Sequence, residues 1–263
     1  MPRQARIDAP GALHHIIVRG IERRKIFKDD TDRYGFLDRL GKVLTETGTR
    51  CFAWSLIPNH FHLLLQTGQR PISAVMSRLL TGHAMAFNRR HRRSGQLFQN
   101  RYKSILCQED TYLLELVRYI HLNPLRARLV ADMKALDKHP FYGHAVIMGK
   151  VDYGWQDDTY VLKLFDNQKA TARRLYKRFV DKGIGQGKRS ELTGGGLIRS
   201  SGGWSAIKSL RKANIHIKSD ERLLGDSDFV ERVLKAAEES WERKYDLKAK
   251  GFDLGGSGTP LKI

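Results

Sequence analysis

The first half of the chain alternates between short apolar runs with the period of a strand and longer runs with the period of a helix. Four strands are predicted from their apolar and β-branched residues: 12–19, 50–56, 59–66 and 97–107. Three helices are predicted from apolar residues at helical spacing: 30–47, 71 to about 89, and 111 to about 123, where Pro124 is expected to end the last one. The order predicts an α+β fold, a ferredoxin-like split βαβ antiparallel sheet with one following helix.

Beyond residue 130 the pattern weakens and predicts helices rather than further sheet. We expect the chain to divide into four parts: a catalytic-type domain at 1–135, a connector at 136–158, a helical extension at 159–246 and a flexible tail at 247–263. Helices are predicted over about 159–181, over 204–211 and from about 227 onward, and the last two are compatible with a helix-turn-helix DNA-binding module. The glycine-rich run 194–203 lacks the context of a phosphate-binding loop, so a turn is favoured there.

Two histidines interrupt the otherwise apolar strand predicted at 59–66. His60 and His62 are two residues apart, so on a strand they point to one face while Phe61 points to the other. Neutral imidazole is a common ligand of divalent metals, and this spacing supplies two ligands from one rigid element. Spacing alone leaves open the alternative that both are simply polar groups at a sheet face.

The charge of the chain points to a polyanionic partner. The formal net charge is +19 with a pI near 10.1, and residues 47–108 contain no Asp or Glu. Nucleic acid is favoured over an acidic membrane because the chain has neither an apolar run of transmembrane length nor a basic amphipathic helix with a clean apolar face. We expect phosphate contacts from these basic residues: Arg19, Arg89, Arg90, Arg92, Arg93, Arg101 and Lys103.

Cysteine usage and the N-terminus indicate a cytoplasmic protein. Cys51 and Cys107 are the only cysteines and form no cluster of the kind that binds metal. The first residues carry no apolar signal segment, so neither secretion nor disulfide stabilisation is expected.

The helix predicted after residue 110 carries a second candidate site. Tyr119 and Asn123 are four residues apart and share a face beside Glu115, so a hydroxyl and an amide are presented together. The alternative is that Tyr119 completes the core and Asn123 is only the last helical residue before proline.

Taken together, these motifs resemble a known family. His15 precedes Arg19 and Gly20; Pro-Asn-His-Phe-His-Leu-Leu follows at 58–64; Arg-Tyr-Ile-His-Leu-Asn-Pro-Leu-Arg-Ala follows at 118–127. This order resembles the REP-associated tyrosine transposases, relatives of the single-strand insertion-sequence transposases in the HUH nuclease group. The resemblance covers about residues 5–135, and residues 189–236 are similar to an extension carried by some members.

The resemblance implies a role for each candidate residue. His60, His62 and Asn123 would hold a divalent metal ion, Mg²⁺ or Mn²⁺, and Tyr119 would be the nucleophile. Attack on a phosphodiester would leave a 5′-phosphotyrosine and a free 3′-hydroxyl, which keeps the bond energy for strand transfer. Where a smaller aliphatic residue is common in the family, Phe61 stands here, and it is expected to alter only the packing behind the ligands.

Tyr102 and Tyr112 are rival nucleophiles, but neither has an amide one helical turn away, so Tyr119 is preferred. His15 is expected to hydrogen-bond within the sheet rather than to bind metal.

The implied function is a metal-dependent endonuclease and strand transferase, a transposase-like enzyme acting on single-stranded DNA beside a hairpin in repetitive palindromic DNA. Two other functions stay open: a non-enzymatic ferredoxin-like nucleic-acid-binding protein, and a metallonuclease that uses activated water. The sequence also leaves open whether one chain or a homodimer assembles the site.

Overall fold

A computed structural model of the protein describes residues 10–187 together with Arg189, Leu192, Leu223, Leu224, Val233 and Lys235. Its centre is an antiparallel sheet in the order β2-β3-β1-β4, to which a two-residue strand adds in parallel beside β4. The strands are β1 (Leu13–Arg19), β2 (Arg50–Ile57), β3 (His60–Gln66), β4 (Lys103–Cys107) and β5 (Leu223–Leu224). This strand order is that of the ferredoxin-like split βαβ arrangement, so the predicted fold class is confirmed.

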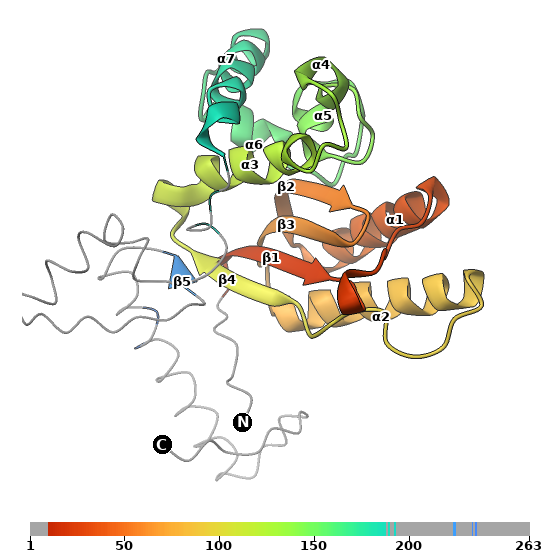
Figure 1. Ribbon diagram of the computed structural model, residues 1–263. Coiled ribbons are helices and arrows are strands. Elements are labelled where there is room, and N and C mark those ends of the chain that lie inside the picture. Colours follow the sequence, from red (N-terminus) through yellow and green to blue (C-terminus); the bar gives the residue numbers. More distant parts are fainter. Residues whose placement is uncertain are drawn as a thin grey trace, which may run out of the picture.

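Helices cover both faces of the sheet (Figure 1). The helices α1 (Asp30–Thr47) and α2 (Ile72–Arg90) pack on one face, and α3 (Glu109–Arg126) packs on the other. Four shorter helices gather on the α3 side in Figure 1: α4 (Met133–Leu136), α5 (Gly143–Ile147), α6 (Asp158–Lys163) and α7 (Lys169–Asp181). Two 3₁₀ turns, η1 (Ile21–Arg23) and η2 (Ile184–Gln186), complete the described elements.

The alternation of side chains along β3 separates the two apolar clusters. Phe61, Leu63 and Leu65 are buried in the cluster formed with α1 and α2. Leu64 is buried in the cluster formed with α3, and His60 and His62 share its face because they stand four and two residues before it. A two-residue turn at Pro58 and Asn59 joins β2 to β3, since Ile57 pairs directly with His60.

Both ends of α1 carry residues suited to a helix terminus. The capping residue is Asp29, whose side chain accepts a hydrogen bond from the Asp32 backbone N–H. The helix ends at Gly48, whose φ of 62° is left-handed and therefore favours glycine.

Two predicted element boundaries are wrong. The strand predicted from residue 97 begins at Lys103. The run Gln99-Asn100-Arg101 has no alternation of apolar and polar side chains. Residues 97–99 lie beside the end of β1, but a single isolated bridge between Gly20 and Phe98 is formed there. The helix predicted to end before Pro124 runs on to Arg126. Proline removes one backbone donor, and so close to the C-terminal end of the helix this interrupts only one intrahelical bond.

The segment predicted as a connector, 136–158, contains the short helix α5, and α6 begins at its end. Residues of α5 and α6 contact β2, and α7 contacts α3, so side chains up to Leu192 share the cluster on the α3 face. The helix predicted over 159–181 is divided into α6 and α7, because the Asp166 carboxylate accepts the Gln168 backbone N–H and turns the chain between them.

The four-part division of the chain stays a prediction. The glycine-rich run 194–203, the helix predicted at 204–211, the start of the following helix at 227 and the tail 247–263 lie outside the described residues.

A buried polar network ties α3 to these short helices. The Tyr176 hydroxyl lies 2.7 Å from Nδ1 of His121 on α3 and 2.7 Å from Nδ1 of His144 on α5. His144 Nε2 contacts the Asp137 carboxylate at 2.9 Å, and Lys177 forms an ion pair with the same carboxylate. Because Tyr176, His121 and His144 are fully buried, this network fixes α3 against α5 and α7.

Among the described residues no helix is both long and apolar enough to cross a membrane. Cys51 and Cys107 are both buried free thiols.

Candidate active site

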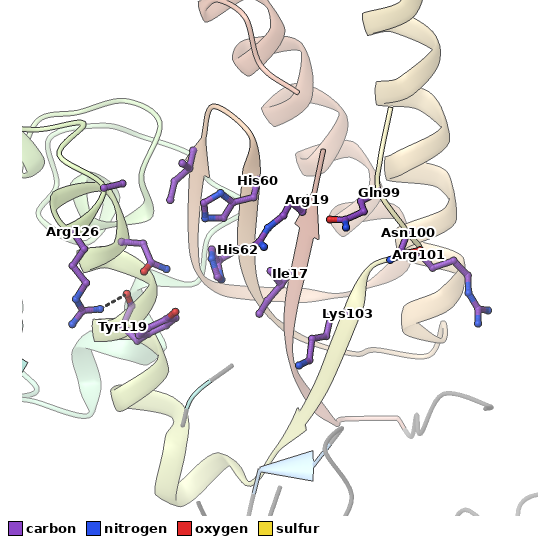
Figure 2. Close-up of a pocket in the computed structure, with 13 residues that line it drawn as sticks. Ile17, Arg19, His60, His62, Gln99, Asn100, Arg101, Lys103, Tyr119 and Arg126 are labelled. Carbon is purple, nitrogen blue, oxygen red and sulfur yellow. Dashed lines mark hydrogen bonds between the residues drawn. The ribbon is translucent and has the colours of Figure 1, made fainter. Parts of the chain in front are cut away.

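A cavity of about 620 Å³ opens between the sheet and α3 (Figure 2). Its wall combines residues from β1, β3, β4, the loop before β4 and the C-terminal half of α3. The lining residues are Ile17, Arg19, Ile57, His60, His62, Gln99, Asn100, Arg101, Lys103, Tyr119, Asn123, Arg126 and Ala127. All four residues expected to take part in chemistry are therefore brought to one cavity within a single chain.

The register of the sheet explains why basic side chains surround the histidines. Arg19 pairs with His60 across β1 and β3, and Ile17 pairs with His62. On its other side Ile17 pairs with Lys103 of β4. Directly opposite residues share a face, so these cations stand on the same side of the sheet as the two imidazoles.

Tyr119 lies beside the imidazoles. Its ring centroid is 5.9 Å from that of His62 and 6.0 Å from that of His15, edge-on to both, and the residue is 9% exposed. Figure 2 shows Tyr119 projecting from α3 toward the strands that carry the histidines. The rivals lie elsewhere: Tyr102 is buried in the cluster with α1 and α2, and Tyr112 does not line the cavity.

The two histidines of β3 are uncharged at neutral pH. Burial, assisted by the charge of Arg19, lowers the pKa of His60 to about 4. Burial is also the main reason that the pKa of His62 lies well below its ordinary value, and the neighbouring His15 and His60 add to the effect. Neutral imidazole is the form that binds metal, so the environment prepares both side chains for coordination.

The hydrogen bonds around His60 determine which of its nitrogens is available. The Asn59 amide Nδ2 donates to the backbone oxygen of Arg23 at 3.2 Å, so the amide oxygen faces His60 Nδ1 at 2.7 Å. An oxygen can only accept there, so His60 Nδ1 carries the proton and Nε2 keeps its lone pair.

Asn123 and Arg126 complete the wall on α3. The Asn123 Nδ2 atom is buried and has no hydrogen-bond partner among the described residues, so its amide is not committed to another protein group. The Arg126 guanidinium lies 5.4 Å from the centre of the Tyr119 ring and donates to the backbone oxygens of Tyr119 and Gly183, each at 3.3 Å. Burial lowers the pKa of Arg126, while the nearby Tyr119 hydroxyl favours its charge.

Three polar residues of the cavity wall, Arg126, Gln99 and Asn100, are not predicted from the sequence. The signal for Arg126 was its spacing, since positions 119, 123 and 126 lie on one helical face. That signal was lost because the helix was expected to end before Pro124. No comparable pattern marks Gln99 and Asn100, which belong to an irregular loop.

The seven basic residues expected to contact phosphate fall into two groups. Arg19, Arg101 and Lys103 line the cavity. The other four, at the end of α2 and in the turn after it, do not line it: Arg89, Arg90, Arg92 and Arg93.

One cluster of metal-type ligands among the described residues lies at the end of α2, formed by Asp29, Asp32 and His91. The guanidinium of Arg90 pairs with Asp29 at 2.7 Å and with Asp32 at 2.6 Å, and His91 Nε2 lies 2.9 Å from Asp32. A cation is thus already supplied by the chain, and the cluster joins the start of α1 to the end of α2. Arg90 is correspondingly engaged in this contact.

Residues 10–123 match the family model described as "Transposase IS200 like". No curated protein matches the chain. Among solved structures, a REP-associated tyrosine transposase bound to a REP hairpin is similar, at 18% identity over 60% of this chain and 98% of that one, with a TM-score of 0.47. A protein of Deinococcus radiodurans R1 assigned as a transposase is similar at 21% identity, over 44% of this chain and 92% of that one, with a TM-score of 0.32.

Proposed function

We propose that the protein, whose residues 10–123 match the family model of IS200-like transposases, is a metal-dependent endonuclease and strand transferase that cuts single-stranded DNA through a covalent tyrosine intermediate. The observation that carries the proposal is the separation of 5.9 Å between the rings of Tyr119 and His62, over one cavity and within one chain. A DNA phosphate in that cavity would meet a nucleophile and metal-type ligands together, which is the positioning that such a reaction requires.

Tyr119 is the proposed nucleophile. Its Oη forms a bond to phosphorus while the bond between phosphorus and the 3′-oxygen breaks; the phenolic proton passes to water, and the departing 3′-oxygen takes up a proton. The products are a 5′-phosphotyrosine and a 3′-hydroxyl end. One phosphodiester replaces another, so the step needs no external energy and its reverse joins a new 3′-hydroxyl to the held strand.

Arg126 supports this step electrostatically. A phenol is a weak nucleophile at neutral pH, because forming the phenolate is unfavourable. The guanidinium beside the Tyr119 ring supplies a positive charge that stabilises the phenolate as it develops, and Tyr119 itself is only 9% exposed.

His60, His62 and Asn123 would hold the divalent ion, Mg²⁺ or Mn²⁺. The residues fit such an ion: both imidazoles are uncharged, and the Asn123 amide, whose buried nitrogen has no partner among the described residues, lines the same cavity. Three protein ligands leave coordination positions for water and phosphate oxygens. When bound, such an ion neutralises charge on the non-bridging oxygens of the scissile phosphate.

The proposed substrate is single-stranded DNA beside a hairpin. Arg19, Arg101 and Lys103 line the cavity and would neutralise the phosphates on either side of the reacting one. Gln99 and Asn100 from the same wall offer amide groups that could hydrogen-bond exposed base edges. We extend the proposal to the C-terminal region, where residues 159–246 would contribute to DNA binding.

The test uses one hairpin oligonucleotide with a single-stranded flank, labelled in separate reactions at its 5′ or its 3′ end, with Mg²⁺ or Mn²⁺. The proposed polarity predicts that the 3′-labelled fragment stays attached to protein after boiling in detergent. The 5′-labelled fragment should be free and end in a 3′-hydroxyl. Tyr119→Phe should abolish both products while still retarding the DNA on a gel, and Tyr112→Phe, on the same helix, should retain both.

Other outcomes would identify the competing functions. Cleavage without a covalent adduct would indicate a metallonuclease that uses water. Retardation of DNA without cleavage in any metal would indicate a binding protein. Cleavage that persists in Tyr119→Phe would remove Tyr119 from the mechanism.

A further inference from the structure

A line of three buried groups leads from the candidate metal site to the segment that follows α7. His62 Nδ1 lies 3.0 Å from His15 Nε2, and His15 Nδ1 lies 3.1 Å from the backbone oxygen of Leu192. The residues are 5%, 0% and 1% exposed respectively, so bulk water has little access to either contact. The stacked His15 and His62 rings, with centroids 5.2 Å apart and planes inclined by 25°, come from neighbouring strands.

The direction of both hydrogen bonds follows from the Leu192 end. A carbonyl oxygen can only accept, so His15 Nδ1 carries a proton and donates it to Leu192. In an uncharged His15 the other nitrogen, Nε2, then has a lone pair and can only accept. His62 Nδ1 must therefore be the donor, which leaves His62 Nε2 as the nitrogen with a free lone pair.

The opposite direction would require a doubly protonated His15. That charge would be removed from water, because His15 is 0% exposed and its ring lies against the rings of the uncharged His62 and of Tyr119. Moving a charge out of water into such surroundings is strongly unfavourable. The uncharged arrangement forms both hydrogen bonds without burying a charge.

We propose that His15 is a positioning residue, which holds His62 in the tautomer and ring orientation that present Nε2 to a metal ion, and that the backbone carbonyl of Leu192 anchors it. This inference rests on the proposed function for the use made of His62. The His60 side chain is prepared in the same way by Asn59, so each imidazole has its own Nδ1 acceptor. Such outer partners fix the tautomer of metal-binding histidines and raise their basicity.

The inference assigns a role to the chain beyond the family domain. Leu192 lies outside residues 10–123, yet its side chain is buried with Leu13, Ile105 and other residues of the catalytic-type sheet. The segment after α7 thus contributes a group to the orientation of a candidate metal ligand. Loss of that segment would free His15 Nδ1 and, through it, the tautomer of His62.

Three substitutions of His15 in the full chain distinguish the hydrogen bond to His62 from the hydrogen bond to Leu192. In His15→Gln the side-chain amide reaches the position of Nε2, so it can still accept from His62. In His15→Asn the amide reaches only the position of Nδ1, so it keeps the bond to Leu192 and loses the one to His62. His15→Phe keeps a ring of similar shape beside Tyr119 and loses both bonds.

The first measurement is the affinity for Mn²⁺ alone, by calorimetry, without DNA. We expect His15→Asn and His15→Phe to weaken Mn²⁺ binding by about 10–100-fold, the usual effect of removing an outer partner of a metal ligand. His15→Gln should bind Mn²⁺ almost as tightly as the unaltered protein. Equal affinity in all three variants, with unchanged cooperative melting, would overturn the proposal.

The second measurement needs neither metal nor activity. In the metal-free, ¹⁵N-histidine-labelled protein, nitrogen chemical shifts distinguish a protonated ring nitrogen from a bare one, and the His62 signals are identified by their loss in His62→Asn. We expect a proton on Nδ1 and none on Nε2. A proton on Nε2 would overturn the proposal even if none of the His15 variants folds. Absence of Mn²⁺ binding by the unaltered protein would instead contradict the proposed metal site and leave the tautomer measurement to decide the role of His15.

Discussion

Acid should destabilise the metal-free protein in a pH range set by its buried histidines. His83 on α2 is 2% exposed among aromatic side chains, its Nε2 donates to the Ile26 backbone oxygen at 2.9 Å, and burial lowers its pKa to about 4. Burial lowers the pKa of His60 to about 4 as well. In the unfolded chain a histidine has a pKa of about 6.5, so between the two values the unfolded state binds more protons.

The sign and the size of the effect follow directly. A histidine with a lowered pKa in the folded state gives no penalty above about pH 6.5, and its penalty grows as the pH falls toward about 4. At pH 5 the folded state has lost about 2 kcal/mol for each such histidine, from about 1.5 pH units at 1.36 kcal/mol each. His83 and His60 together therefore contribute about 4 kcal/mol to the fall in the free energy of unfolding between pH 7 and pH 5. His62 and His121, whose pKa values are lowered mainly by burial, add to this fall.

Carboxylates act in a different range. Asp29, Asp32 and Asp137 have lowered pKa values because of their hydrogen bonds and ion pairs, although burial opposes the change in each. Their contribution to stability is present above the ordinary pKa of 3.8 and is lost only below it. The range from pH 7 to pH 5 therefore reports mainly on the histidines.

The assay is urea unfolding in a chelator at pH 7, 6 and 5, followed by the fluorescence of the buried Trp54. The matched variant is His83→Gln, whose amide can still donate to Ile26 but does not titrate. Its stability should fall less steeply with acid, by about 1.4 kcal/mol per pH unit between pH 6 and pH 5. A free energy of unfolding that is constant from pH 7 to pH 5, or an equal slope in both proteins, would refute the reasoning.

Three further predictions concern the frame and the surface of the site. Tyr176→Phe removes a hydroxyl that lies 2.7 Å from each of two buried imidazoles. Because both nitrogens lose a partner, the free energy of unfolding measured by urea titration should fall by about 2–4 kcal/mol. A fall under about 0.5 kcal/mol, the size of an ordinary surface change, would contradict the network. Gly20→Ala places a Cβ 2.1 Å from a backbone oxygen and should cost about 3 kcal/mol, whereas Gly35→Ala on α1, where no atom lies within 4 Å, should leave the melting temperature unchanged or higher; similar melting of the two variants would show that the turn after β1 yields. Arg101→Ala should weaken DNA binding and reduce its salt slope by about 1, whereas Arg90→Ala should leave the slope unchanged and lower the melting temperature; the reverse pattern would move the DNA to the end of α2.

The elements of the first half of the chain were predictable because local signals agreed with the tertiary fold. Alternate side chains of the strand at 59–66 pack against different helices, which matches the period of its sequence. The helix at 30–47 has a capping residue before it and a glycine after it. The errors arose where one local rule outweighed context. The proline rule predicts that α3 ends before Pro124, but the helix runs on to Arg126, because a proline near the end of a helix interrupts a single bond.

The candidate site was predictable only as far as its residues carried a spacing. His60 with His62, and Tyr119 with Asn123, are pairs that the periods of a strand and a helix place together. Arg126 was missed because its place on that face depends on α3 continuing past Pro124. Leu192 reaches the site from a segment 177 residues after His15, and no local pattern in a sequence reports such a contact.

The attachment point of the DNA tests the central claim most directly. A covalent adduct formed with hairpin DNA would be digested with nuclease and trypsin and analysed by mass spectrometry. Trypsin releases Tyr119 in the peptide 119–126, which has no other tyrosine, while Tyr112 falls in the peptide 104–118 and Tyr102 in the dipeptide 102–103. We predict that the nucleotide mass is carried by the peptide 119–126, on Tyr119; nucleotide on another tyrosine, or cleavage with no modified peptide, would contradict the account.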